Sequence, residues 1–123
     1  MKILTFITTI LLIVSSANAG EWIQVAGGVS QLDLDQHKIE SLLWQHLSKF
    51  KEYEFHPREE YTYQYQASTE EVIYINAFCD NFFSRFDLRK NFLEVEDGGA
   101  CYFQIHYNFK TGRFFDLQVN GEA

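Results

Sequence analysis

The sequence has little that would mark an enzyme or a nucleic-acid-binding protein. It contains no Gly-x-Ser-x-Gly nucleophile elbow and no glycine-rich phosphate loop. Acidic residues outnumber basic ones by 17 to 10, and an acidic surface repels nucleic acids and anionic membranes. The four histidines lack the spacing of metal ligands; they are His37, His46, His56 and His106. We therefore expect no enzymatic activity, no metal or other cofactor, and neither nucleic acid nor membrane as a partner.

A long hydrophobic run occurs only at the beginning of the chain. Lys2 is followed by a largely apolar stretch from Ile3 to Val14 and then by Ala17-Asn18-Ala19, the small-residue pattern of a signal-peptide cleavage site. The stretch is too short for a membrane-spanning helix. The sequence thus predicts a signal peptide over residues 1–19, with an uncleaved anchor as the alternative. The secreted chain would form one domain, residues 20–123.

Cysteine is also scarce, so the chain can form one disulfide at most. Cys79 and Cys101 both follow the predicted signal peptide and would therefore reach an oxidising compartment. We expect a disulfide between them, with two buried free thiols as the alternative. In the chain-entropy model, a loop of this length would stabilise the fold by about 3 kcal/mol.

Pro57 is the only proline, and neither Pro nor Gly interrupts residues 34–50. Apolar side chains recur in this stretch every three or four residues, at Ile39, Leu42, Leu43, Leu47 and Phe50. Polar side chains fall on the other side, at Asp35, Lys38, Glu40 and Lys49. Asp33 and Gln36 match a capping box. The pattern predicts one long amphipathic helix from Leu34 to Phe50, whose apolar stripe the rest of the chain must cover.

After Pro57 the sequence alternates between apolar and polar residues, as half-buried strands do. This pattern predicts four strands, over residues 60–66, 71–79, 101–107 and 115–119. Ala67 to Glu70 and Asn108 to Gly112 read as hairpin loops, the second closed by a left-handed Gly112. Residues 80–99 have no clear period and are expected to form a long irregular excursion. The fold class is therefore α+β, one helix on an antiparallel sheet of four to five strands.

The order of a Gly-Gly arm, one helix and antiparallel strands resembles the cystatin family of secreted cysteine-protease inhibitors. Two stretches carry the resemblance in detail, Val25-Ala26-Gly27-Gly28-Val29-Ser30-Gln31-Leu32 and Cys101-Tyr102-Phe103-Gln104-Ile105. The family's first loop, Gln-x-Val-x-Gly, matches Gln64-Tyr65-Gln66-Ala67-Ser68, where Gln66 and Ser68 depart from it. Phe109-Lys110 stands in place of the Pro-Trp pair of the second loop.

The resemblance implies a cystatin-like fold and an inhibitor of papain-like cysteine proteases. The arm and two loops would form a wedge that plugs the protease cleft without offering a cleavable bond. The implied protease-binding residues are Val25, Ala26, Gly27, Gly28, Gln64, Tyr65, Gln66, Ala67, Ser68, Phe109 and Lys110. We expect a monomer or a strand-swapped dimer.

The alternative is a diverged cystatin-like binding module without protease inhibition. Its partner would be another protein, bound through surface aromatic side chains at Tyr61, Tyr63, Tyr65, Tyr102 and Phe114. Those same residues would instead be core residues in the simplest interpretation, because aromatic side chains supply much of the buried area of a small domain. The altered first loop favours the binding module, and Gly27-Gly28 favours the inhibitor.

Overall fold

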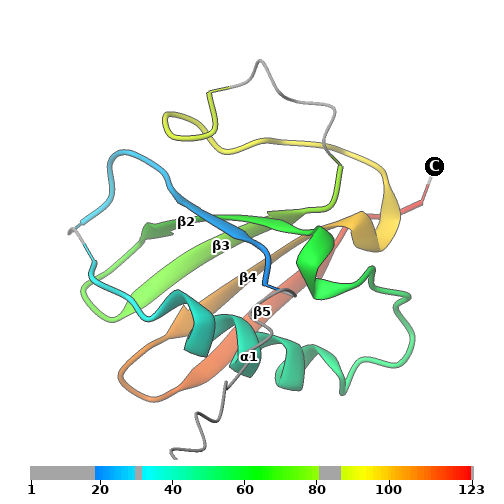
Figure 1. Ribbon diagram of the computed structural model, residues 1–123, viewed down its shortest axis with the longest axis horizontal. Coiled ribbons are helices and arrows are strands. Elements are labelled where there is room, and N and C mark those ends of the chain that lie inside the picture. Colours follow the sequence, from blue (N-terminus) through cyan, green and yellow to red (C-terminus); the bar gives the residue numbers. More distant parts are fainter. Residues whose placement is uncertain (1–18, 30–31, 81–86, 123) are drawn as a thin grey trace, which may run out of the picture.

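The computed structural model describes residues 19–29, 32–80 and 87–122, so most of the predicted signal peptide lies outside the described residues. One helix and five strands form two layers (Figure 1). Helix α1 covers one face of the sheet, and residues 87–97 cross the other face. The elements in chain order are β1 (Glu21–Gln24), α1 (Gln36–Leu47), β2 (Thr62–Ala67), β3 (Val72–Phe78), β4 (Tyr102–Asn108) and β5 (Arg113–Val119), with 3-10 turns at Arg58–Glu60 and Gly99–Cys101.

The sheet has the order β1-β2-β3-β4-β5 and is mixed. Strands β2 to β5 pair antiparallel, as predicted, but β1 runs parallel to β2, with Glu21 opposite Thr62 and Gln24 opposite Tyr65. The prediction of a wholly antiparallel sheet is therefore wrong. Parallel neighbours need a crossover connection. Residues 25–61, which include α1, provide one, and they bring the chain back to the end of the sheet where β1 began.

Helix α1 is shorter than predicted at both ends. Asp35 is its N-cap, and the Asp35 carboxylate accepts a 3.2 Å hydrogen bond from the Lys38 backbone N–H. The predicted capping box at Asp33 is thus wrong, since the cap lies two residues later. After Leu47 the backbone changes to three-residue turns, with the Phe50 N–H bonded to the Leu47 carbonyl at 3.0 Å.

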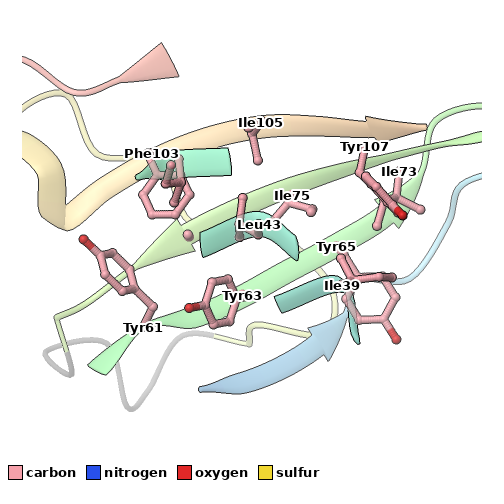
Figure 2. Packing of buried hydrophobic residues seen from close by; sticks show 12 residues of the cluster. Ile39, Leu43, Tyr61, Tyr63, Tyr65, Ile73, Ile75, Phe103, Ile105 and Tyr107 are labelled. Carbon is pink, nitrogen blue, oxygen red and sulfur yellow. The ribbon is translucent and has the colours of Figure 1, made fainter. Parts of the chain in front are cut away.

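The core lies between α1 and the sheet (Figure 2). Three residues of the predicted apolar stripe, Ile39, Leu43 and Leu47, are buried in it. They pack on strand residues that alternate toward the helix and on Tyr61 just before β2; these are Tyr61, Tyr63, Tyr65, Ile73, Ile75, Phe103, Ile105 and Tyr107. One assignment to the polar side is wrong, because Glu40 is 0% exposed. The rest of the chain therefore covers more of the surface of α1 than the apolar stripe alone.

The disulfide prediction is confirmed. Cys79 and Cys101 are bonded, with their Cα atoms 5.0 Å apart, and the Cys79 N–H donates to the Cys101 carbonyl at 2.9 Å. The bridge joins the end of β3 to the 3-10 turn before β4. At the other end of β4, Gly112 has a φ of 71° and closes the β4–β5 hairpin in the left-handed conformation that was predicted for it.

Candidate functional site

The arm that follows β1 lies along the end of β2. Val25 is buried and its N–H donates to the Tyr65 carbonyl at 2.9 Å. Gly27 and Gly28 then have φ values of 92° and 89°, a region that L side chains rarely adopt. A Cβ on Gly28 would come within 2.8 Å of the Ala67 carbonyl oxygen. Paired glycines therefore let the arm approach the backbone of β2 closely before it turns away toward α1.

The first loop connects β2 to β3 and is held by its own polar groups. The Ser68 N–H donates to the Val72 carbonyl at 2.9 Å. The Thr69 hydroxyl accepts hydrogen bonds from the backbone N–H groups of Glu71 and Val72, both at 3.1 Å. The residues from Ser68 to Glu70 are exposed. This loop is consequently a short, exposed tip with little freedom of its own.

The second loop connects β4 to β5 and lies beside the first. The Phe109 N–H donates to the Glu71 carbonyl at 3.0 Å, and Lys110 forms an ion pair with Glu71 at 3.2 Å. Asn108 accepts hydrogen bonds from the N–H groups of Lys110 and Thr111 through its side-chain oxygen, at 3.0 and 3.1 Å. Phe109 is half-buried and packs against the core, whereas Lys110 is exposed.

The structure thus brings the three predicted segments to one end of the sheet. The residues whose side chains or backbone are exposed there are Ala26, Gly27, Gly28, Ser68 and Lys110, with Gln66 and Phe109 partly exposed. Four of the predicted protease-binding residues are buried, Val25, Gln64, Tyr65 and Ala67. Their side chains are therefore not available to a partner. Val29, which is 58% exposed, adds an apolar side chain next to the arm.

Gln64 has a structural role that the sequence did not reveal. Its side chain is fully buried on the face opposite α1, where the amide nitrogen donates to the Leu88 and Asn91 carbonyls, both at 2.8 Å. Its amide oxygen accepts from the Leu93 N–H at 2.8 Å and from Asn76 at 3.1 Å. All four hydrogen-bonding positions of this amide are occupied.

Asn76 and Gln104 extend this arrangement across the sheet. Gln64, Asn76 and Gln104 are register partners on β2, β3 and β4. Asn76 donates to the Leu93 carbonyl at 2.8 Å, and Gln104 donates to Asn76 at 3.2 Å. We call these three side chains the amide row and residues 87–97 the strap. The sequence places an amide side chain on the same face of three successive strands. This pattern indicates a polar contact on that face, which was not predicted.

The tyrosines proposed above as an aromatic surface are core residues. Tyr61, Tyr63, Tyr65 and Tyr102 are at most 8% exposed, and Phe114 is partly buried. Burial raises the pKa of Tyr61 to about 12, and that of Tyr63 is raised further. A different aromatic cluster is accessible on the strap side. There the rings of Tyr74 and His106 are 5.3 Å apart, and His106 stacks on Phe115 at 5.1 Å.

Among the described residues, one group of three side chains could in principle share a metal ion, His56, Cys79 and Cys101. Both sulfur atoms are in the disulfide, however, and a disulfide sulfur is not the thiolate that metals bind. The group borders an open hollow of about 930 Å³ whose acidic lining is Glu21, Glu59, Glu60 and Asp80. In the part of the chain that the structure describes, no helix is long and apolar enough to cross a bilayer.

Comparison of the chain with protein-family models, with curated proteins and with solved structures finds no match in any of the three.

Proposed function

We propose that the chain is a secreted inhibitor of papain-like cysteine proteases that acts through the edge formed by the arm and the two loops. One observation carries the proposal: three segments far apart in the sequence meet at one end of the sheet. Gln66 connects the arm to β2 by a 2.8 Å hydrogen bond to the Ala26 carbonyl, and Phe109 connects the second loop to the first. An inhibitor of this kind needs a narrow, preorganised edge.

The composition of the edge agrees with occlusion rather than cleavage. At the arm, Gly27 and Gly28 carry no side chains and leave the main chain open to close contact. Val29 and Phe109 offer the apolar surface that displaces water at the centre of an interface. Because the edge blocks a cleft by its shape, it needs no nucleophile, acid or base of its own.

The test is a titration of papain and of a cathepsin-L-type protease with the disulfide-bonded protein. Lys110→Glu places a second negative charge beside Glu71 on the edge, and Phe109→Ala removes apolar surface. Lys51→Glu, an exposed site on the turn after α1, makes the same charge change outside the three segments of the edge. We expect stoichiometric inhibition by the wild type and by Lys51→Glu, and weaker inhibition by both edge variants. If the folded wild type does not inhibit at micromolar concentration, the proposal fails.

The second candidate is a binding module that does not inhibit proteases, and the accessible aromatic cluster favours it. Phe115 is 40% exposed and stacks on His106, which in turn contacts Tyr74. Exposed aromatic side chains are common anchors of protein interfaces. For this candidate, Phe115→Ser would abolish binding to the partner, while Lys110→Glu would not change it.

A further inference from the structure

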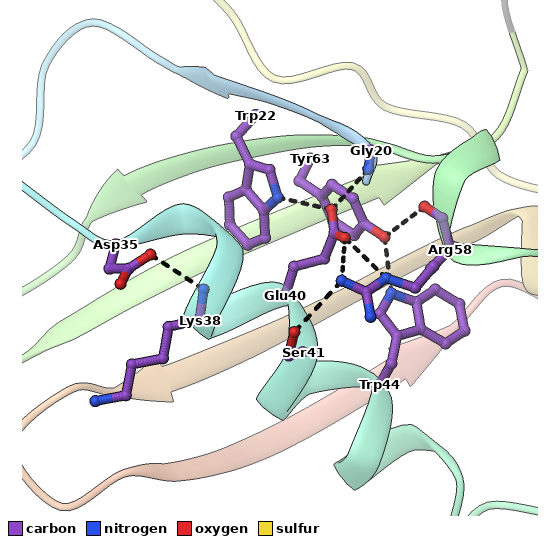
Figure 3. Close-up of polar contacts among 9 residues, drawn as sticks. All are labelled: Gly20, Trp22, Asp35, Lys38, Glu40, Ser41, Trp44, Arg58 and Tyr63. Carbon is purple, nitrogen blue, oxygen red and sulfur yellow. Dashed lines mark hydrogen bonds and ion pairs between the residues drawn. The ribbon is translucent and has the colours of Figure 1, made fainter. Parts of the chain in front are cut away.

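Glu40 is a buried carboxylate that collects four hydrogen bonds (Figure 3). One oxygen accepts from Arg58 through Nε at 2.9 Å and Nη2 at 2.6 Å. The other accepts from the Trp22 indole N–H at 3.1 Å and from the backbone N–H of Gly20 at 2.8 Å. A carboxylate stays charged in such a place only when it is paired and fully hydrogen-bonded. Glu40 thereby joins α1 to the start of β1.

Residue 20 has to be glycine to make this contact. A Cβ at position 20 would overlap the Tyr63 ring and would come within 2.5 Å of the Tyr61 carbonyl oxygen. The close approach places the nitrogen of Gly20, rather than a side chain, on the carboxylate. That nitrogen belongs to the peptide bond that follows Ala17-Asn18-Ala19, the predicted cleavage motif. Ala19 and Glu21 both line the open acidic hollow, so this bond lies at an accessible place.

We infer that Glu40 is the receptor for the α-ammonium group that is released when the Ala19–Gly20 bond is hydrolysed. In that reaction, a leader peptidase adds the oxygen of one water molecule to the Ala19 carbonyl carbon. Ala19 leaves as a carboxylate, and both hydrogen atoms of the water end on the Gly20 nitrogen, which becomes an ammonium. The 2.8 Å contact changes from an amide hydrogen bond to an ion pair.

The surroundings of Gly20 suit a second cation beside Arg58. The Arg58 side chain is 34% exposed, so water solvates part of its charge. The lining of the hollow adds negative charge, from Glu21, Glu59, Glu60 and Asp80. Processing would therefore fix Gly20, the residue that directly precedes β1, and with it the strand that leads into the arm at Val25. The inference does not depend on the arm's binding a protease.

The first test expresses the full-length chain in a secreting host and measures the intact mass of the secreted protein. We expect a chain that begins at Gly20. Its α-amine is then acetylated selectively at near-neutral pH. Acetylation keeps the N–H donor but removes the charge, so the comparison isolates the ion pair. The midpoint of thermal unfolding should fall by roughly 4 °C, the shift that corresponds to a loss of about 1 kcal/mol in a domain of about 100 residues.

Two variants assign the effect to Glu40. In Glu40→Gln the carboxylate is absent, so acetylation should change the midpoint much less than in the wild type. In Glu21→Gln a neighbouring acidic residue that does not accept from Gly20 is neutralised, so the effect of acetylation should remain. An equal effect in wild type and Glu40→Gln would overturn the inference, as would a secreted chain that begins at another residue.

A measurement on the wild type alone covers the case in which Glu40→Gln does not fold. The other titratable groups that face Gly20 are Glu40, Arg58, Tyr61 and Tyr63, and across the hollow Glu21, Glu59, Glu60, Asp80, Tyr102 and His56. Carboxyl and guanidinium groups do not ordinarily titrate at mildly alkaline pH, whereas an α-amine loses its charge from about pH 8 upward. The stability difference between free and acetylated protein should therefore be present at neutral pH and vanish as the pH rises through the pKa of the amine. A difference that is absent at neutral pH, or does not change with pH, would contradict the inference.

Discussion

The side-chain amide of Gln66 donates a 2.8 Å hydrogen bond to the carbonyl of Ala26, 40 positions earlier in the chain. This bond joins the arm to the strand that leads into the first loop. It lies at the surface, next to the Val29 N–H that donates to the Ala67 carbonyl at 3.2 Å. Gln66 stands where the resembled family has an apolar residue, and here it positions the arm.

Gln66→Ala should loosen the arm and leave the fold intact. An intramolecular hydrogen bond contributes about 0.5 to 1.5 kcal/mol, so we expect inhibition of a papain-like protease to weaken by about two- to tenfold. The inhibition constant and the thermal midpoint would be measured together. Gln118→Ala, at an exposed position of β5, is the matched control and should change neither. An unchanged inhibition constant for Gln66→Ala would show that this bond does not preorganise the arm.

Gln64→Ala should destabilise the whole domain. The substitution leaves the Leu93 N–H and the carbonyls of Leu88 and Asn91 without their buried partner, and each unsatisfied group costs about 1 to 3 kcal/mol. We expect a loss of at least about 2 kcal/mol in urea unfolding and faster hydrogen exchange at Leu93. Gln45→Ala, an exposed residue of α1, should have little effect. Unchanged protection at Leu93 would mean that the strap does not depend on the amide row.

Reduction of the Cys79–Cys101 disulfide should lower the free energy of unfolding by about 3 kcal/mol, since the bridge closes a loop between residues 22 positions apart. Chemical denaturation with and without a dithiol reductant measures the difference. The double variant Cys79→Ser/Cys101→Ser should match the reduced protein and should not respond to the reductant. A response in the double variant would point to an effect of the reductant elsewhere.

Stability should fall at strongly alkaline pH because of the buried tyrosines. Burial raises the pKa of Tyr61 from 10.0 to about 12 in the folded state. Folding therefore favours the neutral phenol of Tyr61. The resulting contribution to the free energy of unfolding is fully present below about pH 10 and is lost as the pH rises toward 12. Unfolding curves at a series of alkaline pH values, with tyrosinate absorbance recorded in parallel, measure it. Tyr61→Phe should weaken the dependence of the free energy of unfolding on alkaline pH. An unaltered slope would assign this dependence to other groups.

The strands of the central sheet were predictable because their alternation of apolar and polar residues is strong. Strands β2 to β5 begin and end within two residues of the predicted bounds, and α1 was predicted at the right place although its cap was not. The direction of β1 was not predictable. A strand of four residues alternates in the same way whichever direction it runs, so its pairing depends on where the crossover returns the chain.

The candidate edge was predictable only through the resemblance, because nothing in a local pattern says that residues 25–28 and 109–110 will lie at the same end of the sheet, on either side of the first loop. The buried polar groups were missed for another reason. Glu40 and Gln64 look like surface residues until the elements that cover them are known, β1 and Arg58 for the first and the strap for the second. Burial of a polar side chain is decided by its partners, and these are distant in sequence.

The amide row holds the strap by main-chain atoms. Gln64 and Asn76 bond to the backbone at Leu88, Asn91 and Leu93, and Leu93 alone of the side chains from residue 87 to 97 is buried. These backbone contacts do not depend on which amino acids the segment contains, whereas Leu88, Leu93 and Val95 also pack inward. Its outward-facing positions are free to accept new residues, so one side of the molecule can acquire a different recognition surface while the framework beneath it stays the same.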